Sequence, residues 1–146
     1  MSQYMNLLGQ NAKKASLEKI NTTVKNKILK RFASLLDKEK NSIIKANKKD
    51  LKFALKNKLK NDLIDRLTID HKKLDSIRNS INKITKLKDP VDNTLEKWSR
   101  PNGLKIKKVS IPIGVIGVIY ESRPNVTSDV ASLCFKSGNA VILKGG

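Results

Sequence analysis

Residues 111–146 constrain the fold of this chain more than any other segment, because their pattern is typical of a parallel β-α-β unit. Residues 115–120 (VIGVIY) form a short apolar run rich in β-branched side chains, which predicts a strand covered on both faces. Residues 126–134 repeat apolar positions at helical spacing, and Gly138 follows where a left-handed helix cap is favoured. Residues 140–143 return as a second apolar strand. Because such crossovers are almost always right-handed, we expect parallel strands with the helix on one face.

The residues before this unit predict a series of amphipathic helices. They cover residues 3–20, 24–36, 39–46 and 51–59, a short helix or turn over 62–67, and a longer helix that starts at Thr68 or Asp70 and ends before Asp89-Pro90. The stripe of the second helix expected to face the core comprises Val24, Ile28, Phe32 and Leu35, with Leu29 and Leu36 beside it. Asp50 is expected to cap a new helix, because aspartate favours that position.

A change of composition divides the chain in two. Residues 91–103 contain two prolines and are expected to be a linker. The alternating residues 104–110 (LKIKKVS) predict an exposed edge strand whose lysines discourage unwanted pairing. We therefore expect an N-terminal helical region over residues 1–102, and an edge strand followed by the start of a β-α-β domain over residues 103–146.

The net charge of +18 is compatible with a nucleic-acid partner, but a solvated surface explains it more simply. Residues 103–146 hold only six basic and two acidic residues, so the excess lies in the helical region, where lysines alternate with Leu and Ile. Aromatic residues make up 4% of the chain, too few for base-stacking platforms. We therefore expect no nucleic-acid partner. With a single cysteine and no run of eighteen apolar residues, we also expect a cytoplasmic protein without a membrane span.

Ligands of open α/β sheets bind at the carboxyl ends of the strands, which here are residues 120–125 and 144–146. Arg123 and Lys144 are expected to converge there on one crevice edge, an arrangement that suits an anionic ligand such as a phosphate. The glycines of the first strand do not form the fingerprint that opens a helix on a pyrophosphate.

The chain offers little other chemistry. Cys134 shares a helical face with Val130 and Leu133, which predicts a buried thiol and not a nucleophile. One histidine, His71, and one distant cysteine cannot build a metal site.

The sequence from about Asn11 to Gly146 resembles the N-terminal portion of the γ-glutamyl phosphate reductases, also called glutamate-5-semialdehyde dehydrogenases, of the aldehyde dehydrogenase superfamily. The words YESRPNVT and KSGNAVILKGG are close to the family's own sequence. NAKKAS, IIKANKKDL and LIDRLTID followed by DPV are similar to the family's N-terminal region in order and spacing.

This resemblance implies an α/β fold in which N-terminal helices and an edge strand precede the parallel β-α-β unit of an aldehyde-dehydrogenase-like nucleotide-binding domain. It also implies NADPH-dependent reduction of L-glutamyl 5-phosphate to glutamate 5-semialdehyde, with phosphate release, in proline biosynthesis. In the family a cysteine thiolate attacks the acyl phosphate and the thioester accepts hydride. That cysteine is expected beyond Gly146, since Cys134 matches the signature helix.

The resemblance further implies a homo-oligomer for the full-length enzyme, and residues 104–110 resemble a strand of its oligomerisation arm. Because the family is much longer than this chain, we expect a domain incomplete at its C-terminus, poorly stable and inactive by itself. One alternative is a nucleotide-binding fragment without catalysis. A basic helical protein that binds nucleic acid is less favoured.

Individual roles carry over by position. The strand end that lines the cofactor in the superfamily corresponds to Ile119, Tyr120, Glu121 and Ser122. Lys144 matches the lysine that contacts the adenosine ribose or its 2′-phosphate. The oxyanion residue of this loop corresponds to Ser122 if the family's proline aligns with Pro124, and to Asn125 otherwise. Arg123 has no general counterpart, and its position suggests that it holds a substrate phosphate or carboxylate.

Overall fold

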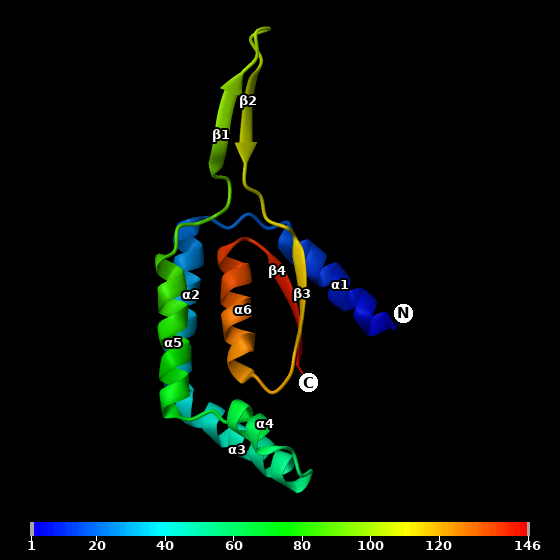
Figure 1. Ribbon diagram of the computed structural model, residues 1–146, viewed down its shortest axis with the longest axis vertical. Coiled ribbons are helices and arrows are strands. Elements are labelled where there is room, and N and C mark those ends of the chain that lie inside the picture. The colour runs from blue at the N-terminus through cyan, green and yellow to red at the C-terminus, as the bar shows by residue number, and fades with distance from the viewer. Residues whose placement is uncertain (1, 146) are drawn as a thin grey trace.

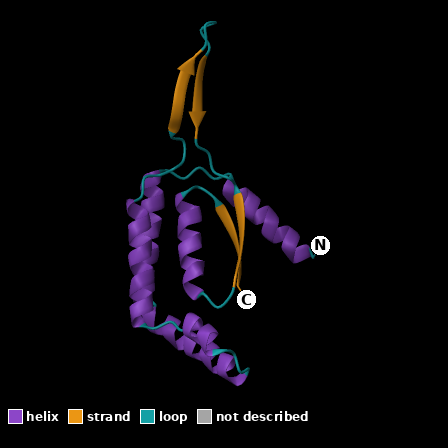
Figure 2. Cartoon of the chain, in the orientation of Figure 1, coloured by secondary structure: helices purple, strands orange, loops and turns teal. Residues whose placement is uncertain are grey.

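The structure, a computed structural model, describes residues 2–145 and arranges them around a short parallel sheet (Figure 1). The elements in chain order are α1 (Gln3–Ser16), α2 (Thr22–Lys38), α3 (Lys40–Lys56), α4 (Asn61–Leu67), α5 (His71–Lys86), β1 (Thr94–Ser99), β2 (Lys105–Val109), β3 (Val115–Tyr120), α6 (Pro124–Lys136) and β4 (Ala140–Gly145). Helices α2 and α5 form one layer, α6 packs between them and the β3–β4 sheet, and α1 lies on the sheet's other face (Figures 1 and 2). The β1–β2 hairpin projects from one end, and α3 and α4 lie at the other.

The parallel β-α-β unit is confirmed. β3 and β4 pair in parallel along their whole length, from Val115 opposite Ala140 to Tyr120 opposite Gly145. Helix α6 starts at Pro124, where the missing N–H costs no helical hydrogen bond. Gly138 follows α6 with φ +72°, and a Cβ there would lie 3.1 Å from the Pro112 ring, so glycine is required for both conformation and space.

The expectation that β3 is covered on both faces is wrong. Ile119 keeps 81% of its surface exposed, and Gly117 is exposed as well. Helix α6 covers one face of the sheet, whereas α1 contacts β4 more extensively than β3 on the other face. The apolar run therefore identified the strand correctly but overstated its burial.

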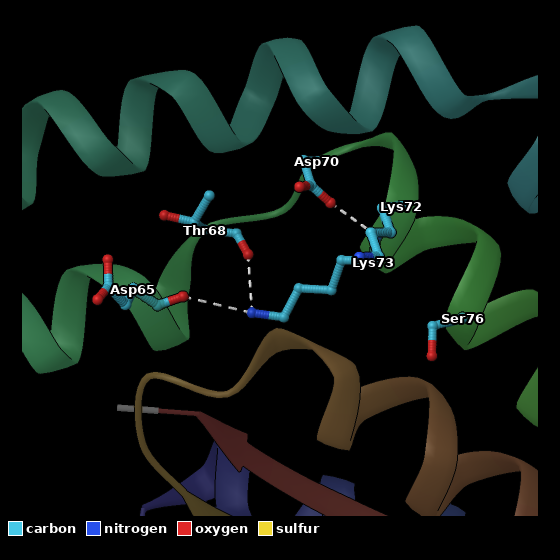
Figure 3. A pocket seen from close by; sticks show the side chains of 6 residues that line it. All are labelled: Asp65, Thr68, Asp70, Lys72, Lys73 and Ser76. Carbon is cyan, nitrogen blue, oxygen red and sulfur yellow. Dashed lines mark hydrogen bonds between the residues drawn. The ribbon is translucent and has the colours of Figure 1, made fainter.

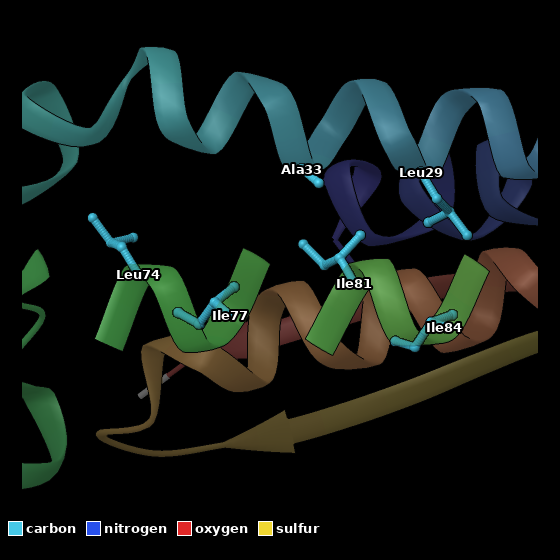
Figure 4. Close-up of a cluster of buried hydrophobic side chains, with 6 residues drawn as sticks. All are labelled: Leu29, Ala33, Leu74, Ile77, Ile81 and Ile84. Carbon is cyan, nitrogen blue, oxygen red and sulfur yellow. The ribbon is translucent and has the colours of Figure 1, made fainter. Parts of the chain in front are cut away.

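The hydrophobic core lies between the helices, not at the sheet. Its buried members are Leu29, Ala33, Leu74, Ile77, Ile81 and Ile84, which come from α2 and α5 (Figure 4). Partly buried Phe135 adds α6 to this cluster. The β-α-β unit is thus stabilised through α6, which packs on the α2–α5 pair.

The inward face of α2 differs from the expected stripe. Val24 and Ile28 remain 41% and 46% exposed, and Leu35 is 38% exposed. The buried positions are Lys25, Leu29 and Ala33. The inward position expected for Leu29 is therefore confirmed, and Phe32 and Leu36 pack against the core as expected. The apolar residues of α2 cover a wide arc of the helix surface. Helix α5 approaches closely on the side of the small Ala33, and that side of α2 is therefore the buried one.

Helix α3 continues through Asp50, so the expected new start at that residue is wrong. The buried Asn47 explains how this helix is held in place. Its amide donates to the Leu67 carbonyl at 2.9 Å and accepts from the Ile69 N–H at 2.7 Å. One side chain therefore fastens α3 to the segment that joins α4 to α5.

Residues 91–103 are not a linker, because they contain β1. This strand pairs antiparallel with β2 and places Trp98 opposite Ile106. The strand expected over residues 104–110 is confirmed as β2, with its lysines exposed. The division expected between residues 102 and 103 falls in the turn of this hairpin.

Two buried lysines tie the layers together. The Lys25 ammonium, whose side chain is 4% exposed, lies 3.0 Å from a carboxylate oxygen of Asp89. The Lys136 ammonium of α6 donates to the Asn26 side chain at 2.6 Å and to the Thr85 carbonyl at 3.3 Å. Helix α2 supplies Lys25 to the first contact and Asn26 to the second, so the two contacts hold α2 against the entrance to the hairpin and against α6.

Candidate functional site

The parallel pairing of β3 and β4 brings their carboxyl ends to one edge of the sheet, as expected. Ile119 is paired with Lys144 and Tyr120 with Gly145. Successive side chains of a strand point to opposite faces, so the two pairs face different sides of the sheet. Tyr120 faces α6, where its hydroxyl group is hydrogen-bonded to the Thr127 hydroxyl group. Ile119 and Lys144 are therefore on the other face.

The loop between β3 and α6 has a constrained backbone. Ser122 adopts φ +48°, a left-handed conformation that is uncommon for a residue with a side chain. Arg123 follows as the N-cap of α6, and no side chain accepts a hydrogen bond from that end of the helix. The amino end of α6 therefore keeps its partial positive charge free for an anion.

A hollow of about 420 Å³ opens at this loop. It is lined by Leu63, Arg66, Val118, Ile119, Tyr120, Glu121, Arg123 and Val126. The structure thus brings four of the expected site residues together and adds α4 as a second wall. The role of α4 was missed by sequence reasoning, since the only signal was the word LIDRL within the family resemblance.

The hollow carries three formal charges within an otherwise mostly apolar wall. Arg66 and Arg123 are exposed cations from different elements, and Glu121 lies beside Arg123 in the loop. None of the three forms an ion pair with another residue in the described part of the chain, whereas Arg78 of α5 is paired with Asp37 at 3.0 Å. The hollow is therefore suited to a ligand with more than one anionic group and one cationic group.

Three expected site residues do not line this hollow. Ser122 and Asn125 lie in the same loop and first helical turn, but the Asn125 amide donates along α6 to Asp129 at 3.3 Å. Lys144 is exposed, and its ammonium lies 3.5 Å from the Gly145 carbonyl. Lys144 and Arg123 thus share one end of the sheet but not one cavity. Gly146, expected to belong to this strand end, lies outside the described residues.

A second hollow, of about 340 Å³, lies between α4 and α5 (Figure 3). Lys73 crosses it and donates to the carbonyls of Arg66 and Thr68 at 2.8 Å each. Asp70 accepts from the Lys73 N–H at 2.7 Å and is the N-cap of α5. The polar groups here are engaged in ending one helix and starting the next, so the cluster is structural.

The prediction of a buried thiol at Cys134 is confirmed. Cys134 is buried, and burial raises the pKa of its thiol, which opposes thiolate formation. Among residues 2–145, no three His, Cys, Asp or Glu side chains are grouped to hold a metal ion. Within the same range, no helix is long and apolar enough to cross a membrane.

Comparison with known proteins identifies the relatives of this chain. The γ-glutamyl phosphate reductase of Nautilia profundicola is 56% identical over 127 residues, which cover 87% of this chain and 31% of the relative. That of Nitratiruptor sp. is 52% identical over 135 residues, or 92% of this chain and 33% of the relative. The chain is homologous to the γ-glutamyl phosphate reductases.

Solved structures of γ-glutamyl phosphate reductases have the same fold. The enzyme of Thermotoga maritima superposes on this chain with a TM-score of 0.90 at 40% sequence identity. The superposed region covers 94% of this chain and 34% of the Thermotoga maritima chain. The Saccharomyces cerevisiae enzyme gives a TM-score of 0.93 at 35% sequence identity, and the superposed region covers 100% of this chain and 38% of the yeast chain. No protein-family model matches the chain. The chain spans about a third of the length of the γ-glutamyl phosphate reductases that it matches.

Proposed function

We propose that this chain forms part of an NADPH-dependent reductase that converts L-glutamyl 5-phosphate to glutamate 5-semialdehyde and phosphate. The observation that carries the proposal is the hollow at the carboxyl end of β3, because its two arginines, which form no ion pair within residues 2–145, suit a substrate with a phosphate and a carboxylate. Relatives named for the same reaction support it. The hollow offers the apolar wall and the charges that a small anionic substrate needs.

The residues of the sheet edge fit the adenosine half of NADPH. Lys144 presents a cation on the exposed tip of β4, which suits a 2′-phosphate. Gly145 has no side chain, and a Cβ at that position would lie in ordinary van der Waals contact with the Tyr120 ring, at 3.8 Å. The nicotinamide, when bound, supplies the hydride that reduces the acyl carbon to an aldehyde.

A chimera provides the test. The segment of the Nautilia profundicola enzyme that matches this chain is replaced by residues 1–146, and oxidation of NADPH is measured with L-glutamyl 5-phosphate. We expect activity with NADPH, and a Lys144→Ala change should raise the KM for NADPH while leaving the KM for NADH unchanged. The matched control is Lys107→Ala on the exposed hairpin strand β2. An inactive chimera beside an active parent enzyme would reject the proposal.

Two further proposals concern the chain by itself. Since it spans about a third of its relatives, we expect no reductase activity from the 146 residues alone. Saturable NADPH binding without turnover, measured by fluorescence titration, would support the nucleotide-binding role. Turnover by the isolated chain would contradict the first expectation.

The homo-oligomer expected for the whole enzyme is checked by light scattering on the chimera.

A further inference from the structure

Three charged side chains from two distant parts of the sequence line the hollow at β3. Arg66 belongs to α4, while Glu121 and Arg123 belong to the β3–α6 loop more than fifty positions later. Around them lie mainly apolar side chains, among which Leu63 and Val126 come from the two facing elements. The three charges are exposed, so a ligand that fills the hollow and excludes water along these apolar walls strengthens the contacts it makes with them.

The backbone of each wall is held in place by contacts outside the hollow. On the α4 side, the Lys73 ammonium binds the Arg66 carbonyl at 2.8 Å, and Asn47 binds the neighbouring Leu67 carbonyl at 2.9 Å. On the loop side, Ser122 is held at φ +48° and Pro124 restricts the first position of α6. Both arginines therefore extend from rigid attachment points, which is what a binding site requires.

The three charged side chains also have no ion-pair partner among residues 2–145. The chain pairs several exposed cations with carboxylates, as in Lys40 with Asp75 at 3.0 Å. Neither Arg66 nor Arg123 has such a partner in the described part of the chain, although Glu121 lines the same hollow. Two cations and one anion thus remain available together.

We propose that these three residues recognise the amino-acid acyl phosphate as a whole. Arg123, beside the uncapped amino end of α6, binds the phosphate, because guanidinium and helix N-terminus both favour that anion. Arg66 binds the α-carboxylate as a bidentate donor, and Glu121 binds the α-ammonium. The inference rests on the proposed function, and it adds α4 and the amino-acid end of the substrate to it.

The reverse reaction separates these roles, because phosphate and glutamate 5-semialdehyde are then independent substrates with NADP⁺. In the chimera, Arg123→Ala should raise the KM for phosphate about tenfold or more and leave the KM for the semialdehyde within about twofold. Arg66→Ala and Glu121→Gln should instead raise the KM for the semialdehyde about tenfold or more and leave the KM for phosphate within about twofold. Arg66→Lys should recover only part of the loss, because an ammonium cannot reproduce the bidentate contact.

The controls keep this inference separate from the proposed function. Arg31→Ala removes an exposed cation of α2 outside the hollow and should change none of the KM values. The KM for NADP⁺ should stay constant in the two arginine-to-alanine variants, and circular dichroism melts identify variants that do not fold. An active chimera in which Arg66→Ala and Arg123→Ala leave both KM values unchanged would overturn the inference, whereas an inactive chimera rejects the proposed function instead.

A binding measurement does not depend on turnover. In the 146-residue chain with labelled arginines, inorganic phosphate should shift the Arg123 side-chain NMR signal, and L-glutamate should shift that of Arg66. The Arg31 signal should not move. Equal shifts at all three arginines, or none at Arg66 and Arg123, would overturn the inference even if the chimera were inactive.

Discussion

Replacing Asp89 by alanine should be among the most destabilising single changes in this chain. Its carboxylate accepts two hydrogen bonds from the Lys25 ammonium at 3.0 and 3.2 Å, one from the Thr22 hydroxyl at 2.8 Å, and one from the Val91 N–H at 3.0 Å. Asp89→Ala removes all of these acceptors and leaves a lysine that is 4% exposed without its counter-charge.

Removing one partner of a buried ion pair costs about 3–5 kcal/mol, because the other charge remains desolvated. With a urea m-value of about 2 kcal/mol/M, the midpoint should fall by about 1.5–2.5 M. The matched control is Glu96→Ala, which removes a pair whose side chains are 57% and 60% exposed and should cost less than about 1 kcal/mol. Urea unfolding followed by circular dichroism measures both.

A double replacement, Lys25→Met with Asp89→Leu, tests the reason for the loss. It removes both charges together, so it should recover most of the stability that Asp89→Ala loses. If Asp89→Ala unfolds within about 1 kcal/mol of the wild type with an unchanged m-value, the reasoning about the desolvated lysine is refuted.

The same site gives a pH dependence of known sign. Burial by itself would raise the pKa of Asp89, but the Val91 N–H, the Lys25 ammonium and the Thr22 hydroxyl outweigh it and hold the pKa below its usual value. The unfolded chain has the higher pKa, about 3.9. The stabilisation is therefore fully present above that value and is lost as the pH falls through the folded-state pKa. Asp89→Ala should lack this acid-dependent component, and urea midpoints between pH 2 and 7 measure the difference.

Three substitutions and one measurement of thiol reactivity test the packing. Ile81→Ala, at a position that is 0% exposed, should destabilise the chain by about 2–5 kcal/mol, whereas Ile119→Ala, at 81% exposure, should cost less than about 1 kcal/mol in the same urea titration. Gly138→Ala should lower the melting temperature, because φ is +72° and a Cβ would lie 3.2 Å from the Val91 side chain; an unchanged melt would contradict the need for glycine. The Cys134 thiol should react with a disulfide reagent much more slowly in the folded chain than in urea, because burial raises its pKa, and equal rates would show that it is accessible.

The sequence by itself determined the elements whose patterns are local. The apolar run at residues 115–120, the return at Ala140 and the glycine at position 138 were sufficient to predict β3, β4 and their parallel pairing, because crossover connections are so restricted. The sequence offered Thr68 or Asp70 as the start of α5, because an N-cap acts within one turn, and the structure shows that Asp70 is the cap. The word LIDRL belonged to the resemblance, yet it did not reveal that Arg66 lines a site.

Tertiary structure alone decided which faces are buried and which distant groups meet. The apolar arc of α2 is wide enough for more than one inward face, and the contact with α5 selected Leu29 and Ala33 over Val24 and Ile28. Helix α3 overrides the helix-start signal at Asp50, since packing outweighs a weak local preference. The hollow joins α4 to the β3–α6 loop across a long separation in sequence, and no local pattern encodes such a meeting. It arises from the packing of α6 on the helical layer, which sets where the end of β3 lies.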